Sequence, residues 1–322
     1  MRVTAGVDFG GTNIKIGLVT PRGQVRHETI VPTRTWQRPA AFVEGLAMVV
    51  TRMLQREHRR CRLEGIGIGA PGLIDATRGR IHRLVNVPGG WEGIALGRLV
   101  SRRMRCVCVV DNDANVVALG EWRFGAGRGA THVVMVTLGT GVGGGLIVEG
   151  RLVRGAAGSA GEIGHVPIRP DGPRCGCGSR GCVEAFVGTR ALRRRTRALI
   201  RQHPGSVLAR FVARERQGLT PELLSRAARA GDRHAQTLWR EVGMELGQAL
   251  AGVVNLLNPE RIIIGGGVAN AWPWFAPSLR RTVRARAFAV PAAAARIVNA
   301  QLGDQAGVVG AASLVWEHRE VA

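Results

Sequence analysis

Three thiols, those of Cys175, Cys177 and Cys182, lie within the stretch CGCGSRGCVE. An imidazole precedes them, that of His165 in the segment GEIGH. Three thiols and one imidazole are a ligand set of closed, tetrahedral structural zinc sites. The alternative is that the cysteines are incidental small residues, which their spacing disfavours. We therefore predict an architectural zinc site, because metal ligation can stabilise a loop that has few apolar residues.

The segment DFGGT, residues 8–12, follows an expected strand. Gly10 and Gly11 allow the backbone to approach an anion closely, and Thr12 adds a hydroxyl donor. Asp8 can hold a metal ion through water. These features favour a phosphate-binding turn, although an ordinary hairpin turn would also explain the two glycines.

A second glycine-rich turn, TLGTGVGGG at residues 137–145, joins two more expected strands. It fits neither the spacing of a dinucleotide-binding turn nor that of a P-loop. One such turn is a weak signal. Two of them, in separate halves of the chain, can hold one polyphosphate from both sides.

The segment DNDAN, residues 111–115, lies where an expected strand becomes a helix. An acid at such a junction can cap the helix. It can equally act as a general base, with the neighbouring amide orienting a substrate hydroxyl. Asp111 and Asp113 are two positions apart and are expected to differ in role, but the pattern alone does not choose between them.

The elements that must position these residues alternate between strands and helices. The first part of the chain predicts a three-stranded meander, a helix near residues 40–60, two buried strands and a further helix, in the segments VTAGVDF, IKIGLVT, QVRHETIV, GIGIGAPG, CVCVVDND and ANVVALGEWRFG. The second part predicts two strands around the second glycine-rich turn, helices at 183–202, 221–230 and 232–257, strands in RIIIGGG and ARIVNAQL, and a terminal helix in GDQAGVVGAASLVWEH. This order predicts an α/β protein with largely parallel sheets and ligands at the carboxyl ends of the strands.

The chain has 322 residues, enough for two domains of ordinary size. It lacks the apolar run of a signal peptide and any apolar stretch of the roughly 20 residues that a membrane helix requires. We therefore expect a cytoplasmic protein with no membrane partner, in which clustered cysteines bind metal rather than form disulfides. The other cysteines, on expected core elements, are predicted to be buried thiols, namely Cys61, Cys106 and Cys108.

The formal net charge of +22 raises the question of a nucleic-acid partner. Lys15 is the only lysine, and the arginines are scattered along the chain as well as gathered in runs such as residues 193–195. An arginine-rich codon bias explains this pattern as well as a binding face does. Because no recognisable reading element accompanies the charge, we expect no specific nucleic-acid partner.

Taken together, these motifs resemble the ROK family (repressors, open reading frames and sugar kinases), a branch of the hexokinase, Hsp70 and actin ATPase-fold group. The resemblance rests on GEIGHVPI followed by CGCGSRGCVE, with DFGGT, APG, NDAN, LGTGVGGG and LNPERIIIGGG in the family's order. It implies an α/β fold of two ribonuclease H-like (actin-like ATPase) domains flanking an interdomain cleft. The smaller domain would comprise 1–112 plus 303–322, and the larger one, 113–302, would carry the zinc loop.

The resemblance also implies an ATP-dependent hexose kinase that uses Mg²⁺ with ATP and a structural Zn²⁺. Asp113 would be the general base, which leaves Asp111 structural. The other implied roles are sugar contacts by Asn86, Asn112, Glu162, His165 and Glu184; nucleotide and magnesium contacts by Asp8, Gly10, Gly11, Thr12, Lys15, Thr140, Gly141, Gly265, Gly266 and Gly267; and zinc ligation by His165, Cys175, Cys177 and Cys182.

Several of these residues have simpler interpretations. His165 could serve zinc alone, Glu162 could cap a helix, and Asn86 in LVNVPGGWEG could be an ordinary turn residue. We favour dual use for His165 and a sugar contact for Glu162. Asn86 favours glucose as the substrate, although N-acetylmannosamine, N-acetylglucosamine, fructose and allose kinases of the family share the other motifs.

A sugar-responsive repressor is the main alternative from another functional class. Repressors of the family carry a helix-turn-helix region ahead of the DxGGT strand, whereas seven residues precede Asp8 here. We therefore expect an enzyme. A zinc-stabilised binding module without catalysis would require Asp113 to be dispensable. The family resemblance also implies a homodimer or a higher homo-oligomer.

Overall fold

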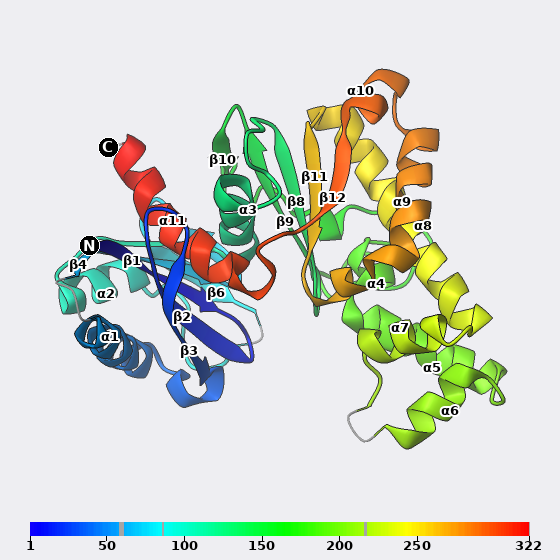
Figure 1. Cartoon of the computed structure of the whole chain (residues 1–322), viewed down its shortest axis with the longest axis horizontal. Helices are drawn as coiled ribbons and strands as arrows, with labels where there is room; N and C mark the ends of the chain where they lie inside the picture. The colour runs from blue at the N-terminus through cyan, green and yellow to red at the C-terminus, as the bar shows by residue number, and fades with distance from the viewer. Residues whose placement is uncertain (58–60, 86, 216–217, 322) are drawn as a thin grey trace. The chain divides into compact units, whose positions relative to one another are not determined.

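The computed structural model describes residues 1–57, 61–85, 87–215 and 218–321 (Figure 1). They form two compact units: Met1–Thr131, Gly145–Gly161 and Ala300–Ala322 make up unit 1, and His132–Gly144 and Glu162–Asn299 make up unit 2. The described residues form two five-stranded sheets together with helices, as the predicted α/β class requires. The domain boundary expected from the sequence, between residues 112 and 113, falls between a strand and a helix that both belong to unit 1.

The sheet of unit 1 has the order β3-β2-β1-β4-β7. Its strands are β1 (Arg2–Phe9), β2 (Asn13–Val19), β3 (Val25–Pro32), β4 (Arg62–Ala70) and β7 (Cys108–Asn112). The first three are antiparallel, as the meander predicted, whereas β4 and β7 are parallel to β1. The register aligns Asp8 with Gly69 and Gly69 with Asp111, so the acidic ends of β1 and β7 lie at the same edge of the sheet.

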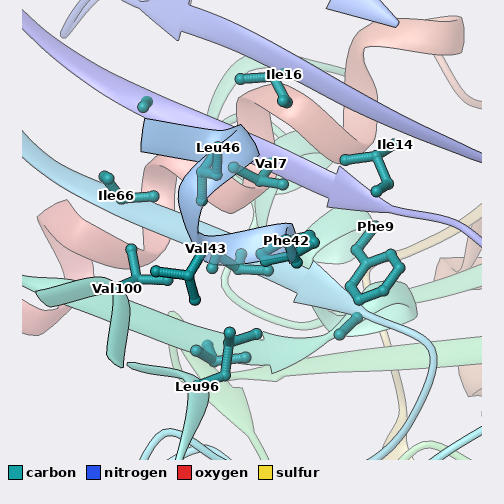
Figure 2. Close-up of a cluster of buried hydrophobic side chains, with 14 of the residues drawn as sticks. Val7, Phe9, Ile14, Ile16, Phe42, Val43, Leu46, Ile66, Leu96 and Val100 are labelled. Carbon is teal, nitrogen blue, oxygen red and sulfur yellow. The ribbon is translucent and has the colours of Figure 1, made fainter. Parts of the chain in front are cut away.

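One face of this sheet carries the core of unit 1 (Figure 2). Val7 and Phe9, two positions apart on β1, both point to this face and pack against Phe42 and Leu46 from α1 (Pro39–Arg56). Helix α2 (Leu96–Met104) covers the same core with Leu96 and Val100. The remaining cysteines are partly buried rather than fully buried, and they pack against the margin of this core, namely Cys61, Cys106 and Cys108.

The opposite face is covered by α3 (Asp113–Phe124) and α11 (Ala306–Val321), which also pack on each other (Figure 1). Glycine makes this close approach possible. A Cβ at Gly67 would lie 1.7 Å from the carbonyl oxygen of Ala311, and one at Gly310 would lie 1.6 Å from that of Val116. No larger side chain fits at either position, so Gly67 sets the distance between α11 and the sheet, and Gly310 sets the distance between α11 and α3.

Unit 1 also contains a hairpin, β5 (Gly72–Asp75) with β6 (Arg80–Leu84), that the sequence did not predict.

The second five-stranded sheet has the order β10-β9-β8-β11-β12, formed by β8 (Val133–Leu138), β9 (Val142–Val148), β10 (Arg151–Val153), β11 (Arg261–Gly265) and β12 (Arg296–Asn299). Here β8, β11 and β12 are parallel neighbours. The two sheets therefore repeat one topological plan, as two glycine-ended strands in different halves had suggested.

The helices of unit 2 are α4 (Glu184–Val187), α5 (Thr189–Gln202), α6 (Val207–Arg214), α7 (Pro221–Arg229), α8 (Arg233–Leu257), α9 (Trp272–Arg286) and α10 (Ala289–Ala294). The two longest, α8 and α9, pack along each other. Among the described residues, we find no helix with the length and apolar character that a membrane crossing demands.

Candidate active site

The junction of β7 and α3 gathers the polar side chains of the segment DNDAN. Asn112 is the N-cap of α3, and its Oδ1 accepts hydrogen bonds from the backbone N–H groups of Ala114 (2.8 Å) and Asn115 (3.3 Å). Its Nδ2 donates to the carbonyl oxygen of Gly72 (3.0 Å). Both lone pairs of Oδ1 are thus engaged, which leaves Asn112 one amide hydrogen to donate to a ligand.

Asp113 is the first residue of α3, and its Oδ1 accepts a hydrogen bond from the N–H of Ala114 (2.9 Å). The N-terminus of a helix favours negative charge, so the ionised carboxylate is stabilised there. Asp111 differs sharply, because it is only 2% exposed and its Oδ1 accepts from the Asn112 N–H (2.7 Å) and from Asn115 Nδ2 (2.8 Å). The structure therefore gives Asp111 a buried position and places Asp113 at the partly exposed helix start.

The DFGGT turn is held in shape by a residue that the sequence did not single out. Thr33 donates from Oγ1 to the carbonyl oxygen of Gly10 (2.7 Å) and from its N–H to the carbonyl oxygen of Thr12 (2.9 Å). The N–H of Gly10 donates to the carbonyl oxygen of Asn13 (3.0 Å). Thr33 lies 21 positions downstream of Thr12, after β3, and only the folded meander brings the two together.

Asp8 and Lys15 are cross-strand partners on β1 and β2. Lys15 Nζ lies 3.7 Å from Asp304 Oδ1 and donates to the Asp304 carbonyl oxygen at 3.3 Å. Burial raises the pKa of Asp8 above its ordinary value, and Asp304 adds to this effect, while Lys15 opposes it. A desolvated carboxylate of this kind suits a site that receives a cation.

We expect the substitution Asp8→Asn to stabilise the protein while impairing its reaction. Because the pKa of Asp8 is raised on folding, this group favours the folded state below its ordinary pKa, and that contribution is lost as the pH rises through the raised value. Asparagine cannot ionise, so the melting temperature at pH 8 should rise by about 2–5 °C. At pH 4 the gain should shrink. Differential scanning fluorimetry at both pH values measures this, and an equal gain at both would contradict the role of ionisation.

In unit 2, the second glycine-rich turn contacts Glu184, the first residue of α4. Glu184 Oε2 accepts a hydrogen bond from the N–H of Val142 (3.0 Å), and a Cβ at Gly141 would lie 2.3 Å from the same oxygen. Thr189, another residue that the sequence did not single out, donates from Oγ1 to the carbonyl oxygen of Gly139 (2.7 Å). The turn that carries Thr140 is therefore fixed by side chains about 42–50 positions away in sequence.

Gly265, the last residue of β11, and the two glycines after it lie beside this turn. Gly265 pairs with Thr137 on β8, and Gly266 has a positive φ of 84°. A Cβ at Gly266 would lie 2.4 Å from the carbonyl oxygen of Leu138. Because β8 and β11 are parallel neighbours, residues 137–141 and Gly265–Gly267 extend from the same edge of the sheet, where α/β proteins bind ligands.

The four predicted metal ligands form one cluster in unit 2. Their ligand atoms all lie within 4.8 Å of one another, from His165, Cys175, Cys177 and Cys182. Cys177 Sγ lies 3.8 Å from Cys182 Sγ, and Cys175 Sγ lies 3.6 Å from His165 Nδ1. These residues could therefore hold a metal ion.

Two further contacts join this cluster to the candidate sugar residues. His165 turns its other ring nitrogen, Nε2, toward Glu162 Oε2 at 3.8 Å, while Glu184 Oε1 lies 3.7 Å from Cys175 Sγ. Gly164 lies against the second glycine-rich turn, since a Cβ there would come 2.0 Å from the carbonyl oxygen of Val142. Asn86, the remaining candidate sugar residue, lies outside the described residues.

Comparison with known proteins shows what this arrangement is related to. The sequence profile of the ROK family matches residues 4–318. The chain belongs to the ROK family. Among ROK relatives, a glucokinase of Halalkalibacterium halodurans is 37% identical, with the alignment covering 96% of this chain and 94% of that protein. A xylose repressor of Caldicellulosiruptor bescii is 30% identical, and the alignment covers 96% of this chain and 77% of the repressor.

Among solved structures, the ROK family glucokinase of Streptomyces griseus, crystallised with glucose and AMPPNP, superposes with a TM-score of 0.79. It is 35% identical in sequence, and the match covers 98% of this chain and 99% of that one. The ROK fold is thus established over nearly the whole chain, and it is the actin-like ATPase fold that the resemblance implied.

Proposed function

We propose that this protein is an ATP-dependent hexose kinase that transfers a phosphoryl group to the 6-hydroxyl of glucose. One observation carries the proposal: Asp113 stands at the N-terminus of α3, next to the capping Asn112, at the same sheet edge as the DFGGT turn. Relatives named glucokinase share the sequence over nearly its full length. These features favour an enzyme over a repressor, because a repressor has no use for a base beside phosphate-binding turns.

In this proposal, Asp113 accepts the proton of the sugar hydroxyl as that oxygen attacks the terminal phosphate of ATP. Asn112 donates its remaining amide hydrogen to a neighbouring sugar hydroxyl. The carboxylates of Glu162 and Glu184 accept hydrogen bonds from the other hydroxyls, and His165 donates one from Nε2, with Asn86 as a further predicted contact. Phosphoryl transfer depends mainly on positioning and on charge neutralisation, which suits a site built largely of backbone turns and polar side chains.

The phosphates of ATP are assigned to the turns that contain Gly10, Gly11 and Thr12 in unit 1 and Thr140 and Gly141 in unit 2. The adenosine is assigned to Gly265–Gly267. Asp8 would hold Mg²⁺ through water, and its buried carboxylate, with its raised pKa, fits such a cation. Mg²⁺ supplies charge neutralisation on the phosphate oxygens. Lys15, paired across the strands with Asp8, would add a further positive charge.

The cluster of His165 and three cysteines fits a structural zinc ion. Two sulfur ligands about 2.3 Å from a tetrahedral Zn²⁺ lie about 3.8 Å apart, and a sulfur and an imidazole nitrogen lie about 3.6 Å apart. The observed separations are 3.8 Å for Cys177 and Cys182 and 3.6 Å for Cys175 and His165. With Nδ1 toward the cluster, His165 keeps Nε2 for Glu162 or for a sugar hydroxyl.

A coupled ADP-release assay with Mg-ATP tests the proposed substrate. The panel is glucose, N-acetylglucosamine, N-acetylmannosamine, fructose, mannose and allose. We expect glucose to give a kcat/KM at least about tenfold above any other sugar, because a site built to hydrogen-bond each hydroxyl discriminates against altered ones. Another sugar in first place would overturn glucose but not the kinase. If no sugar of the panel releases ADP although the protein is folded, the assignment would shift toward a sugar sensor, which an operator-binding titration would then test.

The homo-oligomer, the cytoplasmic location and the lack of a specific nucleic-acid partner stay predictions.

A further inference from the structure

A buried ion network lies behind the β7–α3 junction, within unit 1. The chain that leaves β10 carries Arg154, whose Nε donates to Asp111 Oδ2 at 2.7 Å. Its Nη2 donates to Glu317 Oε2 on α11 at 2.8 Å. Asp111 is almost completely buried, whereas Arg154 and Glu317 are partly buried. Arg154 therefore joins β7 to α11, a helix that packs on α3 (Figure 1).

Arg154 is the positive partner of the buried Asp111 carboxylate. A buried carboxylate without a positive partner is strongly destabilising, and removal of one partner of a buried pair leaves the other uncompensated. Arg154 is the cation that forms an ion pair with Asp111 among the described residues. The other oxygen of Asp111 receives only uncharged donors, the N–H of Asn112 and Nδ2 of Asn115.

Those two donors lie on either side of Asp113 in the sequence. Asn112 precedes it and caps α3, and Asn115 follows it in the first turn of the helix. Asp111 thus holds the backbone on one side of Asp113 and a side chain on the other. A shift of Asp111 would pass directly to the position of Asp113, and misplacement by about 1 Å can cost an enzyme roughly a hundredfold in rate.

We propose that Arg154 is a positioning residue for the base. Through Asp111, it holds Asn112 and Asn115 in place and so fixes the direction in which Asp113 faces the sugar hydroxyl. Arg154 itself touches neither sugar nor nucleotide in this account. The inference rests on the proposed function in one respect, that Asp113 is the base.

The structure offers an unusual way to test this role. A cavity of about 500 Å³ in unit 1 is lined by Arg154 and Glu317, together with Ser101, Cys108 and His318 among others. Truncation of Arg154 to alanine would enlarge this cavity at the point where the guanidinium lay. A small guanidinium compound can then enter from the cavity and take the vacated place between Asp111 and Glu317.

The first experiment compares the steady-state kinetics of Arg154→Ala and Arg154→Lys with wild type. We expect Arg154→Ala to lower kcat by about 10- to 100-fold. The KM values for sugar and ATP should change by less than about threefold, because no substrate contact is lost. Arg154→Lys keeps a positive charge but cannot bond Asp111 and Glu317 with the fixed geometry of a guanidinium, so its kcat should lie between those of wild type and Arg154→Ala. The matched control is Arg123→Ala, which removes an ion pair between α3 and Glu320 on α11 but does not touch Asp111.

The second experiment is chemical rescue. Ethylguanidinium should raise the kcat of Arg154→Ala at least about fivefold, while uncharged ethylurea at the same concentration should not, because only a cation can pair with the buried carboxylates. Wild type and Arg123→Ala should not respond. Rescue by both compounds, or by neither with kcat reduced, would show that Arg154 acts as packing and would overturn the proposal. A kcat of Arg154→Ala equal to wild type would overturn it as well.

A third arm covers the case in which Arg154→Ala fails to fold. Asp111→Asn keeps one oxygen to accept from the Asn112 N–H and Asn115 Nδ2, but it places an NH2 group where Asp111 Oδ2 faces Arg154 and removes the charge that Arg154 neutralises. If Arg154 acts through Asp111, adding Arg154→Ala to Asp111→Asn should cost less than about threefold further in kcat. A full additive loss would overturn the proposed route. If the double variant also fails to fold, Arg154→Lys with Asp111→Asn supplies the same comparison.

Hydrogen exchange separates this proposal from the proposed function. In Arg154→Lys, amide exchange of the segment 112–116 should quicken relative to wild type, and it should stay unchanged in Arg123→Ala. If exchange quickens in Arg154→Lys but the wild-type protein phosphorylates no sugar, the role of the Arg154 network stands and the kinase assignment is wrong. If exchange is unchanged and the wild-type protein is an active kinase, only the role of the network is wrong.

Discussion

Replacing Asp113 by asparagine is expected to lower kcat by about a thousandfold, because general base catalysis contributes roughly 10²- to 10⁴-fold. Asparagine keeps the size of the side chain and can still accept a hydrogen bond from the N–H of Ala114. It cannot take the proton of the sugar hydroxyl. The loss should therefore appear in kcat, while the affinity for sugar, measured by calorimetry without ATP, should change by less than about threefold.

A matched Asp→Asn substitution controls for the loss of charge alone. Asp75 on β5 pairs with Arg78 at the surface and lies outside the proposed site. Asp75→Asn should keep kcat within about twofold of wild type, as surface substitutions usually do. A turnover near wild type in Asp113→Asn, with sugar binding retained, would show that another group removes the proton. Loss of sugar binding without loss of kcat would make Asp113 a substrate contact instead of the base.

The sequence predicts each strand of the two five-stranded sheets except β10, because the signal of these strands is local. Side chains of the segment VTAGVDF point alternately to the core and to the face that the helices cover. Gly6 points to the helix-covered face, where its lack of a side chain allows the close approach of α11. The order of the motifs DFGGT, NDAN and GEIGH identifies the family. Parallel neighbours then bring Asp8 and Asp111 to one edge, as the rule for ligands at strand ends requires.

The elements that the sequence did not predict lack local signals. Helix α2 is nine residues long, and its N-cap, Ala95, makes no side-chain capping bond. Helix α9 contains Pro277 in its interior, which normally argues against a helix. Tertiary packing overrides both patterns, since α2 covers the core of unit 1 and α9 packs along α8.

The supporting residues of the site escape sequence analysis for a different reason. Arg154 is 43 positions from Asp111 and 163 from Glu317, so nothing in the segment GRLVRGAAG indicates its partners. Thr33 and Thr189 each bond a glycine-rich turn from far along the chain. Such contacts depend on the finished fold, whereas the motifs that they support are contiguous.

Removal of the predicted zinc is expected to have the largest effect on stability. Metal analysis of the purified protein should find about one zinc per chain, as a closed four-ligand site implies. Cys182→Ser should lose the metal and lower the melting temperature by at least about 10 °C, because the free energy of zinc binding contributes directly to folding. Cys61→Ser is the matched control, since Cys61 is a partly buried thiol outside the cluster, and it should keep its zinc.

The metal content should also depend on pH in a defined direction. Burial raises the pKa of the Cys175 thiol to about 12, so zinc must displace a proton that this thiol otherwise keeps at neutral pH. Zinc and protons therefore compete, and zinc should be released as the pH is lowered from 8 toward 5. A chromogenic chelator measures the release, and a release that rose with pH instead would contradict thiolate ligation.

Loss of zinc should reach the reaction through Glu184. This carboxylate lies 3.7 Å from Cys175 through one oxygen and accepts the N–H of Val142 through the other, so the cluster and the second glycine-rich turn share a side chain. Demetallated protein should therefore lose affinity for ATP as well as for sugar. Folded protein that lacked zinc, melted at the wild-type temperature and turned over at the wild-type rate would contradict both the site and this coupling.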